Sequence, residues 1–188
     1  IGTGSMNDPY MPVERTYKLT EACLNIIALK KSPVHIMTKS DLVVRDISVL
    51  QDIASTYAAV SFSCTTTDES LCAQLEPGAS STKSRMNAMY SLAKSGLYCG
   101  VSLMPVLPFI TDSIDNLKSL VKCSVDSGAK YMLPFFGMTL RTGQREYFYR
   151  CLDVLGNGLA GQYEKTFGSS YMCLSPKHKA LWENLKEL

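Results

Sequence analysis

The feature of this sequence that most constrains its fold is the regular alternation of short apolar segments with longer segments of helical periodicity. The apolar segments are rich in Val, Ile, Phe and Tyr and are bounded by turn residues, which is typical of buried strands. We predict strands at residues 1–4, 34–38, 58–63, 99–107 and 130–136.

The segments between these strands repeat their apolar residues every three or four positions, as amphipathic helices do. Near-continuous apolar strands that alternate with such helices predict a parallel sheet covered by helices. The fold class is therefore α/β, either a doubly wound sheet or part of a barrel. The predicted helices span residues 20–31, 46–57, 81–96 and 113–128.

Composition is consistent with one domain over residues 1–188, since 46% of the residues are hydrophobic and 19% are charged. Within this domain, residues 156–188 are predicted to form a loop and a closing amphipathic helix, which Trp182 and Leu185 anchor. A net charge of +2 allows a nucleic-acid partner without arguing for one. No apolar run is long enough to span a bilayer and no secretory leader is visible, so we expect a cytoplasmic chain without a membrane partner.

The cysteines are scattered, odd in number, and mostly embedded in apolar segments. We therefore interpret them as small buried residues in a reducing compartment, and we predict no disulfide framework and no metal site. None has the spacing of a zinc site or an iron–sulfur cluster. The seven are Cys23, Cys64, Cys72, Cys99, Cys123, Cys151 and Cys173.

The segment that follows the last predicted strand has the pattern of a helix with interleaved basic and aromatic residues. Such residues can contact the phosphates and bases of a nucleic acid. The alternative is a packed helix with Tyr147, Phe148 and Leu152 in the core. The candidate contact residues are Arg141, Arg145, Tyr147 and Tyr149.

Polar residues follow the carboxyl ends of the predicted strands, whereas the connectors that precede the strands are plain. This asymmetry is expected of parallel α/β folds, whose ligands bind beyond the carboxyl ends of the strands. The polar loops read SMNDPYMPVE, TKSDLVVRD, CTTTDESLCAQLEPG, PFITD and GMTLRTGQRE.

Taken together, these segments resemble a known family. GTGSMNDPYMPVE, IMTKSDLVVRD, VSFSCTTTDE, LEPGA followed by Arg85, and GVSLMPVLPFITD occur in an order that is similar to the radical S-adenosylmethionine (SAM) proteins related to spore photoproduct lyase. The resemblance covers roughly residues 1–150. It implies a partial TIM barrel of the (β/α)6 type, of which this chain carries strands two to six. The first strand and the Cys-x3-Cys-x2-Cys loop that binds a [4Fe–4S] cluster are absent, so the resemblance implies a domain truncated at its N-terminus, with the cluster ligands upstream.

The resemblance assigns candidate roles to the loop after the first predicted strand. Ser5, Asn7 and Asp8 would hydrogen-bond the amino and carboxylate groups of SAM, while Tyr10 and Glu14 would brace the loop. Asp8 has an alternative role as the cap of a turn before Pro9. In relatives that are true lyases, a hydrogen-donating cysteine aligns with Ser5. Repair by the usual hydrogen relay is therefore in doubt.

The remaining candidate SAM contacts come from later strands. Lys39 would reach the ribose or carboxylate of SAM, which agrees with the cation that such a carboxylate needs. A serine on the next strand, Ser61 with Ser63 as the fallback, would bind the same ligand, and Met104 and Pro105 would lie near the adenine. The alternatives are a solvated lysine and a core methionine. Glu76 and Arg85 would form either a ligand clamp or an ordinary surface ion pair.

The resemblance implies a radical SAM, lyase-like enzyme whose complete form cleaves SAM reductively to a 5′-deoxyadenosyl radical. No catalytic residue is assigned, and a nucleic-acid lesion is one candidate substrate. This chain alone is expected to be inactive. The alternative is a non-catalytic α/β binding or regulatory module. We further predict that Lys39, Ser61 and Asn7 converge in one cleft, and that the exposed edge at residues 1–4 can pair with another copy.

Overall fold

A five-stranded parallel sheet forms the centre of the computed structural model, which describes residues 1–4 and 6–188. The strand order is β1-β2-β3-β4-β5, so each strand pairs with its neighbours in sequence, as predicted. Because Pro105 cannot donate a backbone N–H to a ladder, β4 ends before it and is shorter than predicted. The strands are β1 (Gly2–Thr3), β2 (Val34–Thr38), β3 (Ala58–Ser63), β4 (Tyr98–Leu103) and β5 (Met132–Pro134).

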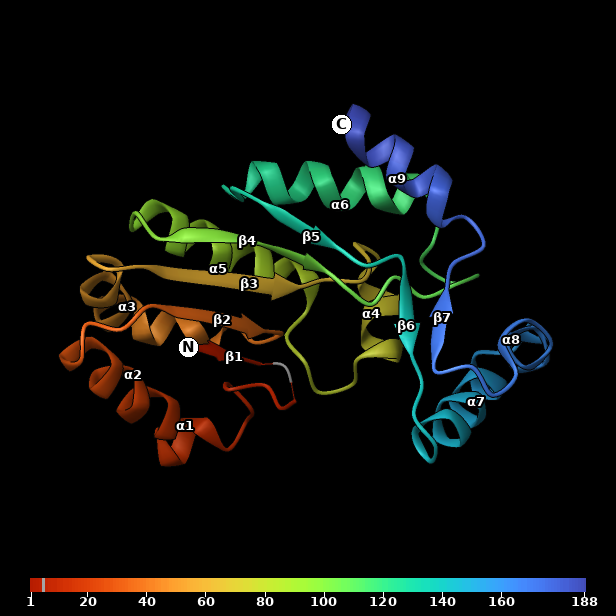
Figure 1. Ribbon diagram of the computed structural model, residues 1–188, viewed down its shortest axis with the longest axis horizontal. Coiled ribbons are helices and arrows are strands. Elements are labelled where there is room, and N and C mark those ends of the chain that lie inside the picture. The colour runs from red at the N-terminus through yellow and green to blue at the C-terminus, as the bar shows by residue number, and fades with distance from the viewer. Residues whose placement is uncertain (5) are drawn as a thin grey trace.

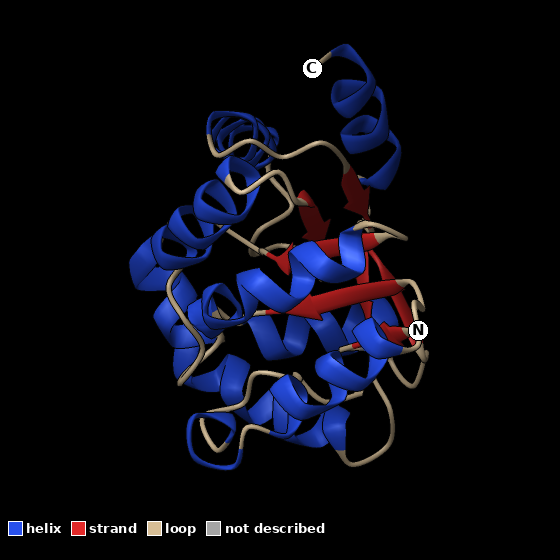
Figure 2. Cartoon of the chain, turned by 90° about the vertical axis from the view of Figure 1, so that its left-hand side faces the viewer, coloured by secondary structure: helices blue, strands red, loops and turns tan. Residues whose placement is uncertain are grey.

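Each of the four predicted helices forms between consecutive strands, within a few residues of its predicted bounds. Figure 2 shows that most of the helices lie to one side of the strands. Ser81 and Ser113 cap α5 and α6 by accepting hydrogen bonds from the backbone N–H groups of Ser84 and Asn116, which explains why both helices begin there. These helices are α2 (Leu19–Leu29), α3 (Ile47–Ala54), α5 (Thr82–Lys94) and α6 (Ile114–Asp126).

Three short helical segments lie in the loops after the strands, where the sequence suggests only polar loops. Asp68 caps the last of them by accepting a hydrogen bond from the backbone N–H of Leu71. Their effect is to give the loops at the carboxyl end of the sheet a defined shape. They are α1 (Glu14–Tyr17), the 3-10 helix η1 (Asp41–Asp46) and α4 (Glu69–Leu75).

The main hydrophobic core lies between the sheet and the helices α2, α3, α5 and α6. Alternate strand residues face the helices because successive side chains of a strand point to opposite faces. On the opposite face, a Cβ at Gly100 would meet the Tyr131 ring and backbone oxygen at 2.5 Å, so only glycine lets Tyr131 lie against β4. The core includes Val34 and Ile36 of β2, Val60 and Phe62 of β3, Val101 and Leu103 of β4, and Leu50, Ile53, Met89, Leu92 and Leu120 of the helices.

A second lobe follows β5 and has its own hydrophobic cluster. It comprises a two-stranded antiparallel sheet of β6 (Gly137–Thr139) and β7 (Met172–Leu174) beside the helix pair α7 (Gln144–Leu155) and α8 (Leu159–Phe167) (Figure 1). The prediction of a loop and one helix for residues 156–188 was therefore incomplete. A strand of three residues that pairs with a distant partner leaves little local pattern. We call this unit the second lobe; its buried residues are Met138, Leu140, Leu152, Tyr163 and Cys173, and Leu107 from the loop after β4 joins their cluster.

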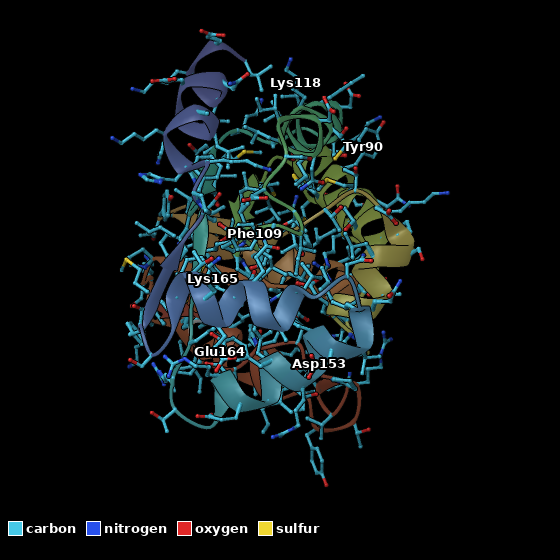
Figure 3. The ribbon with its side chains drawn as sticks, turned by 90° about the vertical axis from the view of Figure 1, so that its right-hand side faces the viewer. Tyr90, Phe109, Lys118, Asp153, Glu164 and Lys165 are labelled. Atoms are coloured by element: carbon cyan, nitrogen blue, oxygen red, sulfur yellow. The ribbon has the colours of Figure 1, made fainter. Side chains whose placement is uncertain are left out.

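Aromatic contacts join the second lobe to the rest of the molecule. Phe109, from the loop after β4, lies against α8 (Figure 3) and makes ring contacts with Tyr163 and Phe167. The predicted closing helix is α9 (His178–Glu187), and its Trp182 packs edge-on against Phe136 at a centroid distance of 5.4 Å. Phe109 thus connects α8 to the loop after β4, and Trp182 connects α9 to Phe136 of the main core.

The burial of two residues differs from the interpretation of the sequence. Tyr147 is 62% exposed rather than packed in the core, although Leu152 on the same helix is fully buried. Cys23 is also exposed, because α2 presents that side to solvent. All seven cysteines are free thiols. In the described part of the chain, no helix is both long and apolar enough to cross a membrane.

Candidate functional site

The polar loops meet at the carboxyl end of the sheet and enclose two neighbouring cavities. We call the larger one, of about 390 Å³, the strand-end cavity, because residues that follow β2, β3 and β4 line it. The loop cavity, of about 290 Å³, lies between the loop after β1 and the segment 77–80. Lys39, Pro77 and Ala79 line both cavities and therefore stand between them.

The strand-end cavity combines an apolar wall with a few polar groups. Leu107, Met138 and Phe148 form much of the apolar wall, and Pro105 also lines it. Thr65, Lys39 and Glu76 supply the polar groups. A mainly apolar pocket with a few convergent polar groups is typical of small-molecule sites. Met104 does not line this cavity, and it is half-buried beside the strand end.

Lys39 lies beside Glu76 in the lining of the strand-end cavity. The Lys39 Nζ lies 3.7 Å from Glu76 Oε1, and 37% of the lysine side chain is exposed. Thr65 Oγ1 donates to the same carboxylate oxygen at 3.3 Å. This lysine is therefore neither fully solvated nor locked in a tight pair, so its ammonium group remains available to an anion in the cavity.

The other oxygen of Glu76 is occupied by Arg85. Arg85 Nη2 donates to Glu76 Oε2 at 2.6 Å, and the arginine side chain is fully buried. The interpretation of these residues as an ordinary surface ion pair was therefore wrong. Local sequence could not reveal this, because Arg85 lies in a polar stretch and is covered only when the loops after β2 and β3 fold over it.

Asp8 acts as a brace rather than as an open ligand group. Its Oδ1 accepts hydrogen bonds from the backbone N–H of Tyr10 at 2.8 Å and from Thr38 Oγ1 at 2.7 Å. Its Oδ2 accepts from the backbone N–H of Lys39 at 2.6 Å. The carboxylate thus ties the loop after β1 to the end of β2, which favours the turn-capping alternative.

Tyr10 and Glu14 brace the same loop. The buried Tyr10 hydroxyl donates to Asp46 at 2.9 Å, and Arg45 bridges Asp46 and Glu14, each at 2.8 Å. Burial and the neighbouring Asp46 carboxylate raise the pKa of Tyr10. Burial also raises the pKa of Glu14, but hydrogen bonds from Arg45 and from the backbone N–H groups of Thr20 and Glu21 outweigh it, so the pKa lies below its ordinary value.

Ser61 lies in a different environment from Lys39. Its buried hydroxyl shares hydrogen bonds with His35 Nε2 at 2.7 Å and with the Tyr131 hydroxyl at 2.9 Å. Burial lowers the pKa of His35 and raises that of Tyr131 to about 12. Sequence reasoning missed His35 and Tyr131 as partners of Ser61, although strand alternation places His35 on the same face of the sheet as Ser61.

The predicted convergence of Lys39, Ser61 and Asn7 is not what the structure shows. Ser61 and Asn7 line neither cavity, and Asn7 is exposed. Ser63 lies beside Arg85, and its backbone carbonyl accepts a hydrogen bond from the guanidinium group. Ser5 lies outside the described residues. Of the predicted ligand residues, Asp8, Tyr10 and Lys39 line the loop cavity, and Lys39 and Pro105 line the strand-end cavity.

Comparison with known proteins gives distant relatives. The chain is 28% identical over 168 residues to the uncharacterized protein Rv2578c of Mycobacterium tuberculosis, covering 89% of this chain and 49% of the relative. It is 31% identical over 112 residues to the uncharacterized protein MJ0683 of Methanocaldococcus jannaschii, covering 60% of this chain and 42% of the relative. The chain thus spans about half the length of the curated relatives that it matches. No family model matches the sequence.

Solved structures of spore photoproduct lyase share the fold. One, a variant with dinucleoside spore photoproduct, matches at a TM-score of 0.53 and 16% identity, covering 67% of this chain and 36% of the lyase. Another, with bound AdoMet and dinucleoside spore photoproduct, gives a TM-score of 0.51 at 16% identity, covering 65% and 35%. With the sequential five-stranded sheet, these matches confirm the predicted α/β fold of partial-barrel type.

Proposed function

We propose that the protein binds SAM in the strand-end cavity and forms a domain of a radical SAM enzyme of the lyase type. The observation that carries this proposal is the placement of Lys39 beside an apolar wall at the carboxyl end of a partial-barrel sheet. The lyase structures with the same fold support it, since one of them holds AdoMet. In such enzymes, bound SAM supplies a carbon-centred radical once a [4Fe–4S] cluster has reduced it.

The residues of the cavity fit the two ends of this ligand. The Lys39 ammonium would hold the carboxylate of the methionine part through a charge-assisted hydrogen bond. Glu76 accepts hydrogen bonds on the same side and would receive the amino group. Pro105, Leu107 and Met138 offer apolar and polarizable surface to the adenosyl group.

The residues present do not fit the cluster itself. Within residues 1–4 and 6–188, no three His, Cys, Asp or Glu side chains are grouped closely enough to hold a metal ion. We therefore assign no step involving a cluster to this chain, and its ligands would have to come from elsewhere. The free cysteines support our placing the protein in a reducing compartment such as the cytoplasm.

We also propose a nucleic-acid lesion as the substrate class, because the lyase structures hold a dinucleoside lesion. On α7, Tyr147 is exposed and available to stack on a base. Arg145, in contrast, donates to the backbone carbonyls of Leu140, Ser169 and Ser170 and serves the second lobe. Tyr147 is therefore the better candidate contact of the two.

Calorimetric titration of SAM into the purified protein tests the binding proposal. We expect saturable binding at one site, and competition by S-adenosylhomocysteine, which keeps the carboxylate and the adenosyl group. Failure of both ligands to bind at millimolar concentration would overturn the proposal and would favour the non-catalytic module.

A further inference from the structure

Arg85 is a buried cation that reaches from α5 to the ends of two strands. Its Nη1 donates to the carbonyl of Ser63, the last residue of β3, at 2.6 Å. Its Nε donates to the carbonyl of Lys39, directly after β2, at 3.2 Å, and to that of Ser80 at 2.8 Å. One guanidinium group therefore holds three separate backbone segments at the carboxyl end of the sheet.

The fourth contact of Arg85 leads back to the side chain of Lys39. Arg85 Nη2 donates to Glu76 Oε2 at 2.6 Å, and Glu76 Oε1 faces Lys39 Nζ at 3.7 Å. Arg85 thus acts on Lys39 twice, on its backbone directly and on its ammonium group through Glu76.

The chemistry of the side chain suits this task. A guanidinium group presents donors in a rigid planar fork, whereas a lysine offers a single point charge on a flexible stem. A buried ion pair is weak evidence of a stabilising role, because well-packed apolar residues often stabilise a core as much or more. The arrangement instead gives the groups at the strand ends one definite geometry.

We propose that Arg85 is a positioning residue that sets the affinity of the strand-end cavity for the carboxylate of its ligand. Arg85 does not line the cavity, so it acts through Lys39 and Glu76. The inference rests on the proposed function, because it takes SAM as the ligand. It extends that proposal from the residues that would touch SAM to the buried group that places them.

The test compares two ligands that differ only in the carboxylate, namely SAM and decarboxylated SAM. In the Arg85→Lys variant, we expect the affinity for SAM to fall about tenfold, the effect of losing one charge-assisted contact. The affinity for decarboxylated SAM should change less than about twofold. An equal loss for both ligands would overturn the proposal and leave Arg85 a purely structural role.

Arg145→Lys is the matched control, because Arg145 also donates to three backbone carbonyls but lies in the second lobe. It should lower the melting temperature and leave the ratio of the two affinities unchanged. A changed ratio in this control would also count against the proposal, since any arginine that donates to backbone carbonyls would then have the same effect.

A measurement on the unaltered protein covers the case in which Arg85→Lys does not fold. The Nε–H of Arg85 donates to the carbonyls of Lys39 and Ser80, so its NMR resonance reports changes in these two contacts. We expect SAM to shift this resonance and decarboxylated SAM to leave it almost unmoved. The same response to both ligands would overturn the inference, while absence of any SAM binding would overturn the proposed function instead.

Discussion

Lys39 lines both cavities, and we propose it as the residue that binds the carboxylate of SAM. Its side chain is partly exposed and its one ion-pair partner, Glu76, keeps a second partner in Arg85. Removing the ammonium group therefore leaves no buried charge uncompensated, so we expect the lysine to contribute little to stability.

We predict that Lys39→Ala weakens SAM binding by about 1.5–3 kcal/mol, which is about ten- to a hundredfold, because it removes a charge-assisted contact. The free energy of unfolding should change little, since a partly exposed lysine supports little packing. Calorimetry and urea denaturation measure the two quantities, with exposed Lys83→Ala as the control. Equal affinities in Lys39→Ala and the unaltered protein would reject the assignment.

Glu14 is expected to make the stability of the loop after β1 depend on pH. Its pKa lies below the ordinary value of 4.5 in the folded state, so it contributes stability that is complete above that value and is lost as pH falls through the folded pKa. Because Arg45 also contacts Asp46, protonation of Glu14 weakens one side of the network that holds Tyr10.

We predict that the free energy of unfolding falls between pH 5 and pH 3 and that Glu14→Gln removes part of this fall. The variant should also be less stable at pH 7, where the ion pair with Arg45 is otherwise intact. Urea denaturation across this range measures both effects, and exposed Glu164→Gln serves as the control. A variant with the pH dependence of the unaltered protein would show that Glu14 titrates normally.

At the scale of the elements, α2 is unusual because it is apolar on two sides. Leu24 and Ile27 are buried against the core, while Leu19, Ile26 and Leu29 are between 60% and 77% exposed. Beside α2 lies β1, an edge strand of the sheet. An exposed apolar stripe next to an edge strand is typical of an interaction surface.

We predict that the protein self-associates through this edge as its concentration rises, and that Ile26→Glu weakens the association. The free energy of unfolding should change by less than about 0.5 kcal/mol, because Ile26 is exposed. Sedimentation velocity measures the association. Val154→Glu, at another exposed apolar position, is the control. A protein that stays monomeric at millimolar concentration would contradict this prediction.

At the scale of the whole molecule, the chain has two hydrophobic clusters of unequal size. The main core is the larger and is organised by the parallel sheet, whereas the second lobe relies on two three-residue strands and a helix pair. Ser175 donates to the buried Asp112 at 2.6 Å, and Tyr163 donates to the carbonyl of Pro108 at 2.8 Å. These contacts hold the second lobe to the loop after β4.

We predict that the second lobe opens before the main core, since it buries less apolar surface. Amide groups of α7 and α8 should exchange with solvent at a lower free energy than those of β2 to β4. Native-state hydrogen exchange in rising denaturant measures this, and Ser175→Ala should widen the difference by removing a contact between the lobes. Equal protection in both lobes would show a single cooperative unit.

The sequence by itself determined the order of the strands and the helices between them, because strand and helix periodicities are local properties. It also placed the polar loops on one end of the sheet, since parallel strands bring their carboxyl ends together. Trp182, which was predicted to anchor the closing helix, packs against Phe136 but is 43% exposed, and Leu181 is the buried residue of that helix.

Only the tertiary structure decided which polar groups face a cavity and which form hydrogen bonds within the protein. Asp8 is occupied by donors from Tyr10 and β2, and Ser61 by partners on β2 and near β5. Likewise, β6 and β7 pair across more than thirty residues of chain. Each strand has three residues and is too short to show a local sequence pattern. The placement of Arg85 depends on the carbonyls of Lys39 and Ser63, which lie 46 and 22 residues away in sequence. In each case the deciding partner is remote in sequence, so the free energy that fixes the side chain arises only when the chain has folded.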